Sequence, residues 1–218
     1  MKTFLVVVLI FFCVIVHAQG KAPERKVDGN VITSERDPKV RIELPKSVQY
    51  AGADRWVLYD IADCELDAFV EADASKNVQA LYWVQFEGYI PSMPELNYKY
   101  DSPRHTKIGD LDFFVDTWVR SKEEDVTPRS DREHIEGLLR TKGYRMPDGM
   151  MYVRLVHLLD EHKRRELMII YGENLLSKGL TAVQLGEKGK AHDQWPAIEK
   201  GLVERARQKI AIQEAAHP

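Results

Sequence analysis

Aromatic, amide and charged side chains alternate with apolar residues along several segments of this chain. In the segment 81–90, LYWVQFEGYI, Trp83, Gln85 and Glu87 fall on one side of an expected strand, and aliphatic and aromatic residues fall on the other. A core face needs only apolar side chains. An indole beside an amide and a carboxylate instead suits a ligand, a partner segment or a covering helix. The sequence leaves these alternatives open.

Two later segments, 111–120 and 151–159, repeat this mixed alternation. Taking the more aliphatic side of each strand as the core side, the opposite sides collect Glu65, Asp67, Phe69, Glu71, Gln79, Trp83, Gln85, Glu87, Asp112, Phe114, Asp116, Trp118, Tyr152 and Arg154. From these we select six candidate ligand-binding residues: Trp83, Gln85, Glu87, Phe114, Trp118 and Arg154. If the strands are neighbours, Trp83, Trp118 and Arg154 should lie close together on one side of the sheet.

The alternative is a purely structural role for this mixed face. Antiparallel sheets commonly have one solvated face, on which carboxylates alternate with aromatic residues. The C-terminal helix could also cover the apolar part of the face. We give this structural interpretation more weight than a ligand site.

Catalytic motifs are absent from the sequence. It contains no G-x-S-x-G or S-x-x-K nucleophile motif, no phosphate-binding glycine loop and no H-E-x-x-H. We therefore predict no cofactor, no metal site and no named catalytic residue, and favour a protein that is not an enzyme. A hydrolase using carboxylates of the mixed face, with Arg154 orienting an anionic group, is the enzymatic alternative.

The first 18 residues, MKTFLVVVLIFFCVIVHA, have the pattern of a secretory signal peptide, with a lysine followed by a short apolar run and a small residue at the end. The run from Phe4 to Val16 is shorter than the roughly 17 residues needed to span a bilayer. We expect cleavage near Ala18, a secreted or periplasmic location, and no membrane insertion after cleavage.

Net charge and cysteine content bear on two further questions, nucleic-acid binding and disulfide formation. Cleavage would remove Lys2 and no acid, leaving 30 basic and 34 acidic residues, a formal net charge of −4. That balance argues against nucleic acid as a partner, because phosphates require a basic surface. Cys64 would be the one remaining cysteine, so no intramolecular disulfide could form. Its alternation with aliphatic residues predicts a buried, inert thiol.

The periodicity of the chain predicts several hairpins and two main helices. Strands are expected at 40–44, 55–61, 64–72, 78–87, 111–120, 151–159 and 166–172, with an edge strand allowed in the proline-rich loop after residue 89. Ser130 and Glu133 have the spacing of a capping box, and Gly143 would end that helix. A short helix at 181–185 and a longer one from about Asp193 complete the pattern.

These elements predict an α+β fold with a mainly antiparallel sheet built from hairpins, a helix between strands and a longer C-terminal helix. We divide the chain into a signal peptide (1–18), a flexible lead-in (19–38) and a single α+β domain (39–218). The favoured function is non-catalytic binding of a small molecule, a peptide or an envelope partner. A third hypothesis is an envelope accessory protein that docks a partner through its C-terminal helix.

Overall fold

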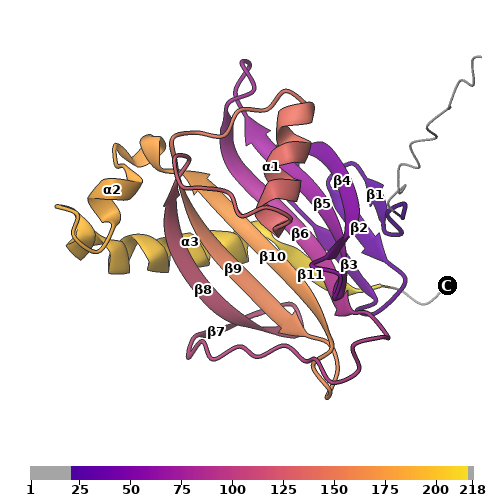
Figure 1. The fold of residues 1–218 in the computed structure, drawn as a ribbon. Coiled ribbons are helices and arrows are strands. Elements are labelled where there is room, and N and C mark those ends of the chain that lie inside the picture. The colour runs from indigo at the N-terminus through magenta and orange to yellow at the C-terminus, as the bar shows by residue number, and fades with distance from the viewer. Residues whose placement is uncertain (1–20, 216–218) are drawn as a thin grey trace, which may run out of the picture.

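A computed structural model describes residues 21–215, so the expected signal peptide lies outside the described residues. The fold is α+β, and its strands pair antiparallel in two sheets (Figure 1). The strands are β1 (Lys26–Asp28), β2 (Val31–Ser34), β3 (Val40–Glu43), β4 (Gln49–Leu58), β5 (Ala62–Ala72), β6 (Val78–Tyr89), β7 (His105–Ile108), β8 (Leu111–Ser121), β9 (Gly149–Leu158), β10 (Arg165–Asn174) and β11 (Ala211–Glu214). The α-helices are α1 (Asp131–Thr141), α2 (Ala182–Leu185) and α3 (Trp195–Lys209), with 3₁₀ turns at Leu175–Lys178 and His192–Gln194.

The large sheet has seven strands in the order β4-β5-β6-β10-β9-β8-β7. Successive strands pair as hairpins at β4–β5, β5–β6, β7–β8 and β9–β10, which confirms the predicted antiparallel hairpin architecture. The two longer-range neighbours, β6–β10 and β8–β9, were not specified by the sequence analysis. They place the segments 78–89, 149–158 and 111–121 within one continuous surface.

The small sheet has the order β1-β2-β3-β11. Residues 26–34, which we expected within a flexible lead-in, form the β1–β2 hairpin, and the expectation of an irregular segment there is wrong. Their alternating pattern is only three or four residues long, too short to stand out among polar neighbours. Ile32 and Ile42 are directly opposite each other and fully buried, so this hairpin contributes to the core.

Both faces of the large sheet are buried over much of their area. One face packs against α1 through Ile135 and Leu139. The other packs against the small sheet and α3, whose Leu202 and Ala206 are buried (Figure 1). The assumption of one core face and one solvated face is therefore wrong for β5 and β6, and α1, rather than the C-terminal helix, covers the mixed face.

The predicted caps of α1 are largely confirmed. The Ser130 side chain accepts a hydrogen bond from the main-chain N–H of Glu133, while the Glu133 carboxylate accepts one from the N–H of Arg129 instead of closing the reciprocal half of a capping box. Gly143 follows the helix with a positive φ of 80°, as a C-terminal glycine should. These caps fix Asp131 in the first turn, directly over the sheet.

None of the helices within residues 21–215 combines the length and the apolar character required of a membrane span.

Candidate functional site

The strand register brings all six candidate residues to one face of the large sheet. Trp83 on β6 and Arg154 on β9 are both paired with Ile170 on β10. Trp118 on β8 is paired with Tyr152, one row further along. Because residues in register share a face, the predicted common side of Trp83, Trp118 and Arg154 is confirmed.

The acids of β5 are not part of this face. Cys64, Leu66 and Ala68 are in register with Glu87, Gln85 and Trp83, respectively. Glu65, Asp67, Phe69 and Glu71 therefore point to the opposite face, toward the small sheet. Their inclusion in the mixed face is wrong because the aliphatic side of β5 and the mixed side of β6 are the same side.

Burial divides the six residues into two groups. Trp83 is 7% exposed and Gln85 is 0% exposed, whereas Glu87, Phe114, Trp118 and Arg154 are half-buried. The Arg154 guanidinium pairs with Asp116 at 2.7 Å. Trp83 and Trp118 both line a cavity of about 20 Å³, room for roughly one water molecule. The space that the two indoles share is thus too small for an organic ligand.

The buried group belongs to a continuous polar chain along β6. The Trp83 indole donates to Gln85 Oε1 at 2.9 Å, and Gln85 Nε2 donates to Glu87 Oε2 at 2.8 Å. The other Glu87 oxygen accepts a hydrogen bond from the Tyr98 hydroxyl at 2.8 Å. The amide of Gln85 is therefore held with its donor toward a carboxylate, which fixes Glu87 under the proline-rich loop.

Glu87 is the centre of a wider group of acids and one thiol. Cys64 on β5, Glu87 on β6 and Asp131 in the first turn of α1 each place a potential metal-ligating atom within 4.8 Å of the others. We call these three residues the Cys64 cluster. Glu166 on β10 is in register with Glu87, and its carboxylate accepts from the Tyr100 hydroxyl at 2.9 Å. Four elements of the fold thus bring these four side chains together.

Burial and mutual repulsion raise the proton affinities of the group. Burial, reinforced by the Glu87 charge, raises the pKa of Glu166 to about 8 and that of Asp131 to about 6. Burial also raises the pKa of the Cys64 thiol strongly, with Glu87 and Asp131 adding to the effect. Glu166 and Cys64 therefore retain protons near neutral pH.

The negative charges of this group lack a basic partner in contact. Within residues 21–215, no lysine or arginine side chain forms a hydrogen bond or ion pair with Glu87, Asp131 or Glu166. Asp131 Oδ1 is moreover a buried oxygen without any hydrogen-bond partner in that range. Buried polar oxygens are normally paired, because leaving one unpaired costs about 1–3 kcal/mol.

Comparisons with known proteins add nothing to this geometry. A scan against protein-family models finds no match, and searches of the curated proteins and of the solved structures find none either.

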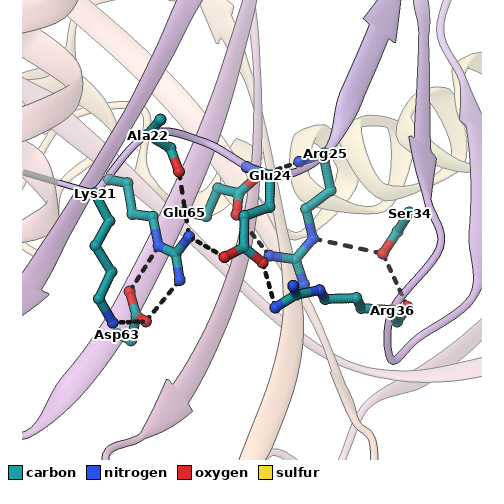
Figure 2. Close-up of polar contacts among 9 residues, drawn as sticks. Lys21, Ala22, Glu24, Arg25, Ser34, Arg36, Asp63 and Glu65 are labelled. Carbon is teal, nitrogen blue, oxygen red and sulfur yellow. Dashed lines mark hydrogen bonds and ion pairs between the residues drawn. The ribbon is translucent and has the colours of Figure 1, made fainter.

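On the opposite face, the N-terminal segment is tied to β5 by ion pairs. Figure 2 shows Arg25 against Glu65. Arg55 on β4 pairs with both Glu24 and Asp63. Glu65 also accepts hydrogen bonds from the main-chain N–H groups of Glu24 and Arg25. The cations of this network are neutralised by neighbouring acids, so the network holds the N-terminal segment in place.

A cavity of about 310 Å³ lies beside this network and includes Glu87 and Glu166 in its lining. Phe86 and Arg165, which also line it, point to the small-sheet face. Because side chains alternate along a strand, the carboxyl groups of Glu87 and Glu166 point to the α1 face. They do not form a carboxyl pair opening into this cavity, and the hydrolase hypothesis gains no support from it.

The sequence analysis selected Glu87 but missed Cys64, Asp131 and Glu166 as its neighbours. They lie far apart along the chain, at positions 64, 131 and 166, so no motif spacing could indicate them. A usable signal was that Glu166 falls in the apolar segment 166–172, where a carboxylate facing the core requires a reason.

Proposed function

We propose that this chain is an exported, non-catalytic binding protein, and that one of its ligands is a divalent cation such as Zn²⁺ held by Cys64, Glu87 and Asp131. The observation that carries the proposal is the convergence of a thiol and two carboxyl groups from three elements within 4.8 Å. The signal-like N-terminus supports export, and the absence of catalytic motifs supports a binding role.

The donor set suits a borderline-soft cation. Zn²⁺ accepts cysteine sulfur at about 2.3 Å and carboxylate oxygen at about 2.0–2.2 Å, whereas Ca²⁺ and Mg²⁺ prefer oxygen ligands only. Tetrahedral ligands at such distances lie roughly 3.3–3.8 Å apart, so small side-chain shifts close the set. A cation would also give Asp131 Oδ1 the partner that it lacks.

Neighbouring residues would hold the metal-binding side chains in position. Tyr98 and Gln85 hold Glu87 by hydrogen bonds, and Ser130 fixes the first turn of α1, which carries Asp131. Such partners orient metal ligands and strengthen binding. Glu166, protonated near neutral pH, would limit the negative charge left around a bound cation.

Metal binding is tested with the purified, chelator-treated chain. Titration with Cd²⁺ should produce the ultraviolet absorption of a metal–thiolate bond, and Zn²⁺ should compete for the same single site. At 100 times the dissociation constant, Zn²⁺ should stabilise the fold by about 2.7 kcal/mol. Affinity should rise with pH, because binding displaces the Cys64 proton.

Three variants separate this site from nonspecific binding. Cys64→Ser should abolish the thiolate absorption, and Asp131→Asn should weaken Zn²⁺ binding at least tenfold. Asp116→Asn is the matched control, since Asp116 lies on the same sheet face but pairs with Arg154. Equal Zn²⁺ affinity in the wild type and Cys64→Ser would refute the cation site.

Export is tested separately by expressing the full chain and sequencing the N-terminus of the product outside the cytoplasm. We expect cleavage near Ala18. A product that retains the first 18 residues in the cytoplasm would contradict export without bearing on the cation site.

A further inference from the structure

The outer edge of β7 is an unpaired strand edge. β7 ends the large sheet, and its sole strand partner within the described residues is β8. The two strands are joined by the two-residue turn Gly109–Asp110, so Ile108 and Leu111 form the hydrogen-bonded pair next to it. The hydrogen bond from the Val115 N–H to the Arg104 C=O agrees with this assignment, because Arg104 and Val115 would form another hydrogen-bonded pair of the same ladder.

The alternation of hydrogen-bonded pairs between β7 and β8 determines which main-chain groups of β7 face away from the sheet. Hydrogen-bonded and non-hydrogen-bonded pairs alternate along an antiparallel ladder, so Thr106 and Ile108 bond to β8, while His105 and Lys107 direct their N–H and C=O groups away from it. Within residues 21–215, no hydrogen bond reaches the main chain of His105 or Lys107. Two such residues offer an added strand four hydrogen bonds.

A groove runs along this edge. A cavity of about 820 Å³ lies between α3 and the segment 103–106, and a second of about 390 Å³ adjoins it at Glu204 and Arg207 and continues to Lys107 and β11. Val115 and Val203 give the larger cavity an apolar part. An open strand edge beside a helix is the geometry in which extended peptides bind by strand addition.

The charged side chains along the groove and on β7 indicate which kind of peptide would bind. On the α3 side its charged side chains are Arg104, Lys200 and Arg207 against Glu199 and Glu204. Lys107 is in register with Asp112, so its side chain points to the α1 side of β7. Arg104 and Arg207 pair with those two acids, but Lys107 and Lys200 form no ion pair with any described residue. A lysine on an edge strand opposes strand addition in general. An added strand that places an acid beside Lys107 would compensate that charge, because opposite charges on neighbouring strands attract.

We propose that this groove binds an extended peptide of a partner protein, in which acidic and apolar residues alternate, as an additional strand on β7. The apolar side chains would face Val203 on the α3 side, and the acidic side chains would face Lys107 on the α1 side. This inference does not depend on the cation site, which lies on the α1 face of the sheet.

The test uses a fluorescein-labelled octapeptide of alternating valine and glutamate, with a valine–lysine octapeptide as the charge control. Fluorescence anisotropy should show saturable binding of the acidic peptide and at least tenfold weaker binding of the basic one. By NMR hydrogen exchange, the peptide should protect the amides of His105 and Lys107 and leave those of Thr106 and Ile108 unchanged.

Variants separate main-chain from side-chain contributions. Lys107→Pro removes an outward N–H without removing a hydrogen bond to β8, and should abolish peptide binding. Lys107→Ala keeps the N–H and should bind the peptide more weakly than the wild type does. Val203→Glu on α3 should also abolish binding and leaves β7 unchanged. Absence of peptide binding, or binding without amide protection at His105 and Lys107, would overturn the proposal. So would self-association that Lys107→Pro abolishes, since the occupant would then be a second copy of the chain.

Discussion

The carboxyl group of Glu166 should make the stability of the protein depend on pH. It is 2% exposed, and burial beside Glu87 raises its pKa to about 8. An acid whose pKa is raised on folding stabilises the folded state below its unfolded pKa, near 4.3, and this contribution is lost as the pH rises through about 8. We therefore predict that Glu166→Gln is more stable than the wild type at pH 8.5, by about 2–4 kcal/mol, and not at pH 4.5.

Urea unfolding of the metal-free protein at both pH values measures this difference. Glu161→Gln is the control, because Glu161 is exposed in the turn between β9 and β10 and its variant should follow the wild-type pH profile. A Glu166→Gln profile parallel to that of the wild type would show that the carboxyl group titrates normally.

The burial of a single residue was predictable where hydrophobic periodicity alone determines it. Cys64 is buried as expected, because it continues an aliphatic alternation. The contacts of His134 were not predicted: it stacks on Trp56 with ring centroids 4.0 Å apart, and its Nδ1 is 2.7 Å from Asp54 Oδ2. Its partners come from β4, some 80 residues earlier, and no local pattern reports such a contact.

At the level of elements, the β7–β8 turn should tolerate substitution less than a similar turn elsewhere. Gly109 has a φ of +59°, and a Cβ there would lie 2.2 Å from the main-chain oxygen of Ile212. Gly29 has a φ of +58° with nothing within 4 Å of such a Cβ. Both alanine variants incur the left-handed strain of about 1–2 kcal/mol, but Gly109→Ala must also displace β11.

We expect Gly109→Ala to lower the free energy of unfolding by about 1–3 kcal/mol more than Gly29→Ala does, since that is the usual cost of an overpacked contact. Chemical denaturation of the two variants measures the difference. Equal losses would mean that β11 is not held against this turn.

The predicted elements were the long ones. Strands of about ten residues and the capped helix carry enough alternation to be recognised, and their hairpins follow from short turns. The pairing of β6 with β10 and of β3 with β11 joins segments that are distant in sequence. The hydrophobic periodicity of one sequence does not reveal which strands pair. The common face of the six candidate residues was correctly predicted, but its burial under α1 depended on this unpredicted packing.

For the whole molecule, Glu65 should control whether the N-terminal segment stays attached. Glu65 is 1% exposed, pairs with Arg25 at 2.7 Å and accepts hydrogen bonds from two main-chain N–H groups. Removing one partner of a buried pair leaves an uncompensated charge and costs about 3–5 kcal/mol. Glu65→Ala should therefore lower the free energy of unfolding by about that amount and expose residues 21–36 to limited proteolysis.

Glu35→Ala is the matched control for that variant, because the Lys26–Glu35 pair belongs to the same hairpin and both of its side chains are largely exposed. Exposed pairs contribute little to stability because solvent screens them, so this variant should unfold and resist protease nearly as the wild type does. If Glu65→Ala behaved the same way, the segment would be held by the β2–β3 pairing and not by the ion pairs of Figure 2. The attachment would then be a property of the small sheet, and its disruption would require breaking Ile32 against Ile42.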